Sequence, residues 1–257
     1  FMYPYAIIWG IDLYTIFLCV GIIAALLTFR LFSDYKKMYW KLQNFTIITA
    51  VLSICGGYGS AVLFQGFYNF LDDPSKGFQL NNGTGATFYG GLIGGAIGVI
   101  IYCKQFSVPL KPFMNVAAPA IPLMHAIGRI GCVCAGCCYG MEYDGPFAIT
   151  YPCHEFTYEI CGVPRFPTQL VETAVNLVLA VSLYIFVKKG VKKDGQPIGI
   201  YLIVYSIMRF LLEFVRDDSV RGGMLGLSTS QWISLLLLPL GLYLVFRKDR
   251  VDRSVEN

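Results

Sequence analysis

Charged residues are scarce in this 257-residue sequence: Asp, Glu, Lys and Arg make up 14% of it, whereas about a quarter is usual in soluble globular domains. Hydrophobic residues make up 56% and the mean hydropathy is +0.59, which excludes a large soluble domain and a disordered chain. Alternating hydrophobicity is also missing, because runs such as Trp232–Leu238 are almost continuously apolar, and this favours helices over a membrane β-barrel. The composition predicts an all-α polytopic membrane protein.

Apolar stretches between charge clusters predict seven transmembrane helices, since a span needs about 20 apolar residues. The expected spans cover residues 10–32, 43–65, 86–103, 113–131, 169–187, 197–215 and 230–246. They form one membrane-embedded domain over residues 1–257, with a small Cys-rich head segment at 132–168. No inverted duplication of the kind found in transporters is evident.

Most of the 20 Lys and Arg residues fall in alternate loops or at their edges, as Lys36, Lys188 and Arg247 do. Cytoplasmic loops are the richer in Lys and Arg, so this distribution predicts an N-terminus outside and a cytoplasmic C-terminus. Residues 132–168 would then lie outside the cell. The basic residues do not gather on one surface with interleaved aromatics, so the net charge of +4 does not indicate nucleic-acid binding.

Arg129 lies where the fourth expected span meets the outer boundary. A guanidinium near hydrocarbon is costly unless it is paired or faces a polar cavity, which makes it a functional candidate. Extension of the side chain to the outer headgroups is the structural alternative.

The sixth expected span carries a polar stripe at spacings of four, four and three residues, made of Tyr205, Arg209, Glu213 and Arg216. Glu213 can pair with either arginine and leave positive charge for a ligand, although a purely structural ion-pair stripe is the alternative. Arg129 and Arg209, on different helices, form a candidate clamp for a phosphate such as a phospholipid headgroup.

The fifth expected span begins with polar residues after Pro167, which suits the first turn of a helix. Thr168 can serve as a cap, while Gln169 and Glu172 enter the helix at membrane depth. The Glu172 carboxylate needs a partner in an apolar helix, and Arg129 or Arg209 could supply it.

Taken together, these motifs resemble those of the prolipoprotein diacylglyceryl transferase family. The motifs, in order, are Tyr14, Tyr89–Leu92, Gly128–Gly131 with a segment ending at Gly140, Arg165–Glu172, Arg209–Arg216 and Ser228–Leu235. The resemblance implies a seven-span enzyme of the bacterial plasma membrane that acts in lipoprotein biosynthesis. Such an enzyme takes diacylglycerol from phosphatidylglycerol and joins it to the lipobox cysteine thiol of a preprolipoprotein, releasing glycerol phosphate.

By position, the resemblance implies that Arg129 and Arg209 hold the phosphate and its developing charge. It also implies that Tyr14 and Tyr205 line the lipid site and that Gly140 shapes the entrance from the head segment. The other expected substrate-binding residues are Tyr89, Gly90, Gly91, Gln169, Glu172, Glu213 and Arg216. No cofactor or metal is expected.

Several positions depart from the family pattern, which indicates a divergent branch. Tyr89 stands where the family has the histidine of its HGGL motif, the proposed thiol base, and an arginine of the second span is replaced around Tyr58. His125 lies one helical turn before Arg129 and is a candidate replacement base; a buried histidine without chemistry is the alternative.

Cysteines crowd the head segment, at positions 132, 134, 137, 138, 153 and 161. A disulfide staple, a zinc site with His125 or His154, and a reactive thiolate remain open explanations. Cys134 and Cys137 provide one C-x-x-C element with no second, so a four-ligand zinc site is poorly specified. Cys132 and Cys137 replace an Asn and a Glu of the family, and Cys137 is a candidate catalytic thiol because Arg129 could lower its pKa.

The leading hypothesis is therefore a phosphatidylglycerol-dependent diacylglyceryl transferase with a thiol acceptor, acting at the outer face of the bilayer. A related transferase with a different acceptor is one alternative. A phospholipid-binding or translocating membrane protein that lacks the transfer chemistry is another.

Overall fold

The computed structural model describes residues 7–8, 11–35, 88–153, 157–217, 223–224 and 226–247, with a few single positions between 59 and 75. The chain divides into two compact units. One comprises Phe1–Phe29 with Met114–Asp252, and the other comprises Arg30–Phe113 with Arg253–Asn257. The second expected span, residues 43–65, lies outside the described residues except for single positions.

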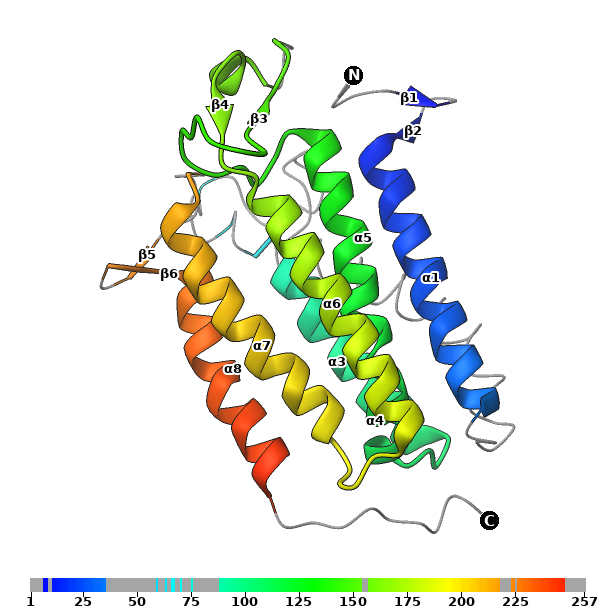
Figure 1. Cartoon of the computed structure of the whole chain (residues 1–257). Helices are drawn as coiled ribbons and strands as arrows, with labels where there is room; N and C mark the ends of the chain where they lie inside the picture. The colour runs from blue at the N-terminus through cyan, green and yellow to red at the C-terminus, as the bar shows by residue number, and fades with distance from the viewer. Residues whose placement is uncertain are drawn as a thin grey trace. The chain divides into compact units, whose positions relative to one another are not determined.

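Helices account for most of the described structure (Figure 1). They are α1 (Leu13–Tyr35), α3 (Phe88–Gln105), α4 (Leu110–Ala117), α5 (Ala120–Ala135), α6 (Thr168–Lys189), α7 (Gln196–Leu212) and α8 (Thr229–Phe246). Two short 3-10 helices are η2 (Tyr158–Ile160) and η3 (Glu213–Val215). The described strands have two residues each and form antiparallel pairs. β1 (Ile7–Ile8) pairs with β2 (Ile11–Asp12), β3 (Ile149–Thr150) with β4 (Pro164–Arg165), and β5 (Gly223–Met224) with β6 (Leu227–Ser228).

Four helical segments are long and apolar enough to cross a membrane: Leu13–Phe32, Thr168–Lys189, Gln196–Val215 and Thr229–Phe246. Helices α4 and α5 meet at a bend of 42° and make a fifth if the pair counts as one span. These segments coincide with five of the expected spans, so the chain is a multi-pass membrane protein. Helix α3, with 18 residues, overlaps the third expected span but begins and ends two residues later than the prediction, 86–103.

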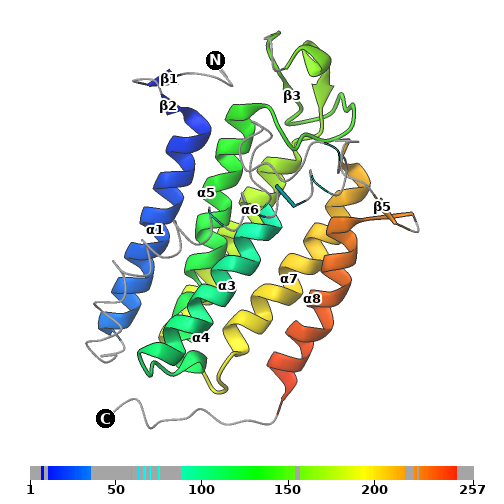
Figure 2. The same cartoon turned by 180° about the vertical axis from the view of Figure 1, so that it is seen from behind.

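Within the larger unit, α5 packs on α6, α6 on α7, and α7 on α8, as the two opposite views show (Figures 1 and 2). Two glycines let α7 and α8 approach closely. A Cβ on Gly199 would lie 2.9 Å from the Gly241 carbonyl oxygen, and a Cβ on Gly241 would lie 3.0 Å from that of Gly199. Small residues at such a crossing permit close backbone contact between membrane helices.

The described residues between α5 and α6, 136–153 and 157–167, include β3 and β4 and fold at one end of these helices (Figure 1). A small apolar core joins Ile149, Tyr151 and Ile160 of this segment to Val133 of α5. A disulfide joins Cys153 to Cys161. Helix α5 continues to Ala135, four residues beyond the expected end of the fourth span, so Cys132 and Cys134 are helical.

Candidate functional site

Helix α6 carries a polar face in an otherwise apolar sequence. The face is made of five buried residues at helical spacing: Thr168, Gln169, Glu172, Thr173 and Asn176. The helix begins directly after Pro167, as expected from the sequence. Buried polar groups at membrane depth mark a site when they find partners on other helices. Thr173 and Glu172 contact α5, and Glu172 also contacts α7.

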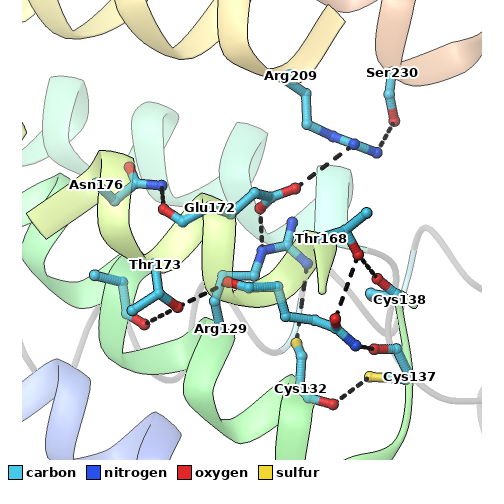
Figure 3. A network of polar contacts seen from close by, with 12 residues as sticks. Arg129, Cys132, Cys137, Cys138, Thr168, Glu172, Thr173, Asn176, Arg209 and Ser230 are labelled. Carbon is cyan, nitrogen blue, oxygen red and sulfur yellow. Dashed lines mark hydrogen bonds and ion pairs between the residues drawn. The ribbon is translucent and has the colours of Figure 1, made fainter. Parts of the chain in front are cut away.

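Glu172 connects arginines from two other helices (Figure 3). Its Oε2 atom forms an ion pair with Nε of Arg129 on α5, and its Oε1 atom lies 3.6 Å from Nη1 of Arg209 on α7. Only 2% of the Glu172 side chain is exposed. The structure therefore brings together the three residues that the intramembrane charges had singled out.

Arg209 has two further partners. Its Nη2 atom lies 2.5 Å from Oε2 of Glu213 and donates a hydrogen bond of 3.1 Å to Oγ of Ser230 on α8. A capping box, in which the side chains of Ser228 and Gln231 bind each other's backbone N–H groups, begins α8 and places Ser230 in its first turn. Ser230 was not among the predicted site residues, although it lies in a family-like motif.

The polar stripe expected on the sixth span is shorter than predicted. Tyr205 and Arg209 lie on α7, but that helix ends at Leu212, and Glu213 begins the 3-10 helix η3. Arg216 follows with an extended backbone and forms a β-bridge with Gly140. The prediction that Arg216 shares a helix face with Arg209 is therefore wrong, because the helix unwinds before Arg216.

Gly140 joins three segments beside the arginine network. Its N–H group donates to the Phe166 carbonyl at 3.1 Å, and the next N–H group, of Met141, donates to the Val215 carbonyl at 2.9 Å. A Cβ at position 140 would lie 2.7 Å from the Phe166 oxygen and 3.0 Å from the Val215 oxygen. No side chain fits there without moving backbone.

Arg165 stabilises the same junction. Like Ser230, it was not among the predicted site residues. The buried guanidinium donates hydrogen bonds to Oδ2 of Asp217 at 2.6 Å and to the Gly140 carbonyl at 3.4 Å. It also lies over the Tyr139 ring, 4.8 Å from the centroid. These contacts fasten the chain that follows α7 to the segment that precedes α6.

Gln169 and Thr168 hold the turn after α5. Nε2 of Gln169 donates to the Cys137 carbonyl at 2.7 Å and to the Tyr151 hydroxyl oxygen at 3.0 Å, and Oγ1 of Thr168 donates to the Cys138 carbonyl at 2.6 Å. Burial raises the pKa of Tyr151 to about 12, and the Gln169 hydrogen bond partly offsets the rise. Gln169 thus positions backbone around the site.

Aromatic rings lie beside the arginines. The His125 ring on α5 is 4.9 Å from that of Tyr205 on α7, which is stacked on Tyr201 at 5.5 Å. Tyr14, on α1, packs against α5 where a Cβ on Gly131 would lie 3.4 Å from its ring. Tyr89, Gly90 and Gly91 belong to α3, but the surroundings of these three residues are not described, and Tyr58 and His154 lie outside the described residues.

The cysteines divide into a disulfide and a group of thiols. Cys153 pairs with Cys161, while Cys132, Cys137 and Cys138 remain thiols whose sulfur atoms lie within 4.8 Å of one another. Thiol hydrogen bonds with Cys132 and Cys138 raise the pKa of Cys137, so the expectation that Arg129 lowers it is wrong. The lowered pKa is that of Cys138, because of hydrogen bonds from Cys132 and Cys137 and then the fields of Arg216 and Arg129.

The fold and this site define a multi-pass helical membrane protein with a buried arginine and carboxylate network between its helices. The family model described as prolipoprotein diacylglyceryl transferase matches residues 4–247, and the chain belongs to that family.

Three relatives show how far the similarity extends. The chain is 34% identical over 241 residues to phosphatidylglycerol–prolipoprotein diacylglyceryl transferase 2 of Clostridium perfringens, covering 92% of this chain and 91% of that protein. It is 32% identical over 244 residues to the transferase of Clostridium tetani, covering 94% of each. A transferase of Dehalococcoides mccartyi is 28% identical over 254 residues, which is 93% of this chain and 92% of that protein.

Proposed function

We propose that this chain transfers diacylglycerol from phosphatidylglycerol to the thiol of a prolipoprotein lipobox cysteine and releases glycerol phosphate. Relatives that match over more than nine-tenths of their length are named for these two substrates. The observation that carries the proposal is the meeting of Arg129 and Arg209, from different helices, at the Glu172 carboxylate. Two guanidiniums held side by side match the oxygens of a phosphate diester.

In the proposed reaction, the acceptor thiol loses its proton and its sulfur forms a bond to the glycerol carbon of the diacylglycerol moiety. The bond from that carbon to the phosphate oxygen breaks, and glycerol phosphate leaves with the electron pair. Negative charge therefore grows on the phosphate in the transition state, where Arg129 and Arg209 stabilise it. Glu172 holds both guanidiniums in place before the lipid arrives, so little reorganisation is needed during the reaction.

Formal charges support an anionic ligand. Arg129 and Arg209 are balanced by Glu172 and Glu213, and Arg216 adds a further positive charge whose field reaches the cysteines after α5. The network thus carries one more guanidinium than carboxylate groups. An excess of guanidiniums over carboxylates suits a phosphate group better than a neutral lipid headgroup.

His125 is the proposed base for the acceptor thiol. It lies on α5 one turn before Arg129 and contacts Tyr205 through its ring, so it is near the phosphate side of the site. Tyr14 and Tyr205, on two other helices, are proposed to line the acyl chains and the glycerol. Both have large, partly apolar surfaces suited to a lipid near the headgroup level.

The proposed setting is the bacterial plasma membrane, with seven spans, the N-terminus outside and the C-terminus in the cytoplasm. Lys188 and Lys189 end α6 at the opposite end from residues 136–167 (Figure 1), as the excess of basic residues in cytoplasmic loops requires. The Cys153–Cys161 disulfide supports an outside location for the head segment, because such bonds persist in oxidising compartments.

Release of glycerol phosphate from headgroup-labelled phosphatidylglycerol by the purified protein tests the proposal. We expect release that depends on a lipobox peptide and is lost with a peptide in which serine replaces the lipobox cysteine. His125→Ala should abolish this release while leaving lipid binding intact. Lipid binding without release, over a range of lipobox peptides, would contradict the proposed activity.

A further inference from the structure

The chain reverses at the end of α5 and returns along the last turn of that helix. Gly136 has a left-handed backbone, with φ of 64°, a conformation that favours glycine at a helix end. The N–H groups of Gly136 and Cys137 donate to the Val133 and Cys132 carbonyls, at 3.2 Å each. The reversal brings Cys137 and Cys138 beside Cys132, which lies one turn before the end of the helix.

Helix α6 holds the reversed segment by its backbone, as the hydrogen bonds in Figure 3 show. The Cys137 carbonyl accepts from Gln169 and the Cys138 carbonyl accepts from Thr168. Both donors are at least 98% buried. Because the carbonyl groups face α6, the three thiols are kept together on fixed backbone, and little conformational entropy remains to be lost on binding a ligand.

The spacing of the sulfur atoms fits a shared metal ion. The Sγ atoms of Cys132, Cys137 and Cys138 all lie within 4.8 Å of one another. In a tetrahedral zinc site with Zn–S bonds of about 2.3 Å, neighbouring sulfurs are about 3.8 Å apart. Side-chain rotations that shorten the distances between sulfurs by about 1 Å therefore suffice to place three sulfurs around one ion. Cys134, which the C-x-x-C pattern paired with Cys137, is not part of this group.

The surrounding charges suit a cluster of thiolates. Nη1 of Arg129 lies 3.9 Å from Sγ of Cys132. Three thiolates around a divalent ion leave one net negative charge, which the adjacent Arg129 guanidinium offsets. Such partners outside the ligand set commonly strengthen a metal site.

We propose that Cys132, Cys137 and Cys138 bind a thiophilic d10 metal ion, Zn²⁺ or Cu⁺, through three sulfur ligands. Thiolate ligands select these ions over hard ions such as Mg²⁺. Among the described residues, no fourth Cys, His, Asp or Glu ligand atom joins the group, so Zn²⁺ keeps one position for an external ligand, whereas Cu⁺ is satisfied by three sulfurs. The site adjoins the proposed transfer site at Arg129, but the proposed transfer reaction needs no metal.

Metal titration of the reduced, chelator-treated protein in detergent tests the site. We expect one Cd²⁺ per chain with a sulfur-to-metal charge-transfer band in the ultraviolet, and an excess of Zn²⁺, but not of Mg²⁺, should compete for the site. A parallel titration with Cu⁺ against a coloured chelator shows which of the two d10 ions binds the tighter. Cys132→Ser, Cys137→Ser and Cys138→Ser should each weaken Cd²⁺ binding at least tenfold.

Cys134→Ser and Cys19→Ser are the matched controls, since both cysteines are thiols outside the group, and both variants should bind Cd²⁺ like the wild type. Thermal unfolding of the metal-free variants shows whether each one is folded. The proposal is overturned if folded wild-type protein gives no charge-transfer band, or if the three cluster variants bind as tightly as the controls. A disulfide between two of the three cysteines in the isolated protein, with no Cd²⁺ bound after reduction, overturns it as well.

Discussion

Glu172 on α6 forms an ion pair with Arg129 on α5, and only 2% of the Glu172 side chain is exposed. Its second carboxylate oxygen lies 3.6 Å from Arg209 on α7, so one buried carboxylate sets the separation of two arginines. Removing one partner of a buried ion pair leaves an uncompensated charge, which typically costs about 3–5 kcal/mol. In the proposed enzyme, the arginines would then lose both their spacing and part of their charge balance.

We therefore expect Glu172→Gln to lower both stability and turnover. The amide keeps the shape of the carboxylate but not its charge, so repulsion between Arg129 and Arg209 is no longer offset. Turnover should fall at least tenfold and the thermal midpoint should fall as well, measured by glycerol phosphate release and by unfolding in detergent. Glu142→Gln is the control, because that carboxylate is exposed and should leave both quantities unchanged. Full turnover in Glu172→Gln would contradict the positioning role.

Arg129→Lys and Arg209→Lys test the guanidiniums themselves. Lysine keeps the positive charge but lacks the planar pair of donors that a phosphate accepts. Loss of one preorganised donor typically lowers kcat about 10²–10³-fold, and we expect a loss of this order in each variant with lipid binding retained. Arg30→Lys, which changes an exposed arginine on α1, should keep wild-type turnover. Alanine at position 129 or 209 should abolish turnover in a folded protein; wild-type rates from either would exclude the clamp.

The parts of this structure that the sequence could predict are those decided by local patterns. Apolar runs located α6, α7 and α8, and the cost of charge in a membrane singled out Arg129, Arg209 and Glu172. The exit of Arg216 from its helix could not be predicted, because it depends on a backbone bridge to Gly140, 76 positions earlier in the chain.

The cysteine group is a second feature that could not be predicted from the sequence. The C-x-x-C pattern favoured Cys134, whereas the turn at Gly136 brings Cys138 to Cys132 instead. That turn is stabilised by Gln169 and Thr168 from α6, which are distant in sequence. The role of Ser230 was not predicted for a similar reason. A serine at the start of a helix usually binds backbone groups of that helix, and only the packing of α7 on α8 brings Ser230 to Arg209.

Gly140→Ala should damage the junction next to the arginines. The added Cβ would lie 2.7 Å from one backbone oxygen and 3.0 Å from another, and overpacking of this kind typically costs about 1–3 kcal/mol. We expect a lower thermal midpoint and a loss of turnover, because Arg216 and Phe166 must move. Gly98→Ala is the control: a Cβ there meets nothing within 4 Å, so helix stability should be kept or slightly improved. Equal behaviour of the two variants would argue against a steric role for Gly140.

The proposed membrane orientation can be measured with fusions. Green fluorescent protein attached after residue 257 should fluoresce, because it folds in the cytoplasm, and alkaline phosphatase attached there should be inactive. Maleimide labelling of intact cells should then reach a cysteine introduced at Tyr158, which is 77% exposed in the head segment. The same reagent should not reach a cysteine introduced at Lys192, an exposed residue of the turn between α6 and α7. Labelling in the opposite pattern would reverse the orientation.

Alkaline pH should reveal the burial of Tyr151. Its pKa is raised to about 12 in the folded protein by loss of hydration, whereas an unfolded tyrosine ionises near pH 10. The neutral phenol is thus favoured by folding, so its contribution is complete below pH 10 and is lost as the pH rises from 10 to 12. A difference of two pKa units corresponds to about 2–3 kcal/mol.

We expect the thermal midpoint of the wild type to fall more steeply over this interval than that of Tyr151→Phe, which has no phenol to ionise. At pH 8 the variant should be the less stable of the two, because Gln169 loses the Tyr151 oxygen as an acceptor while keeping its bond to the Cys137 carbonyl. The two curves should therefore converge as the pH approaches 12. Tyr158→Phe, which changes an exposed tyrosine of the same segment, should follow the wild type throughout. Parallel curves for wild type and Tyr151→Phe would show that Tyr151 ionises in the folded state as it does in water.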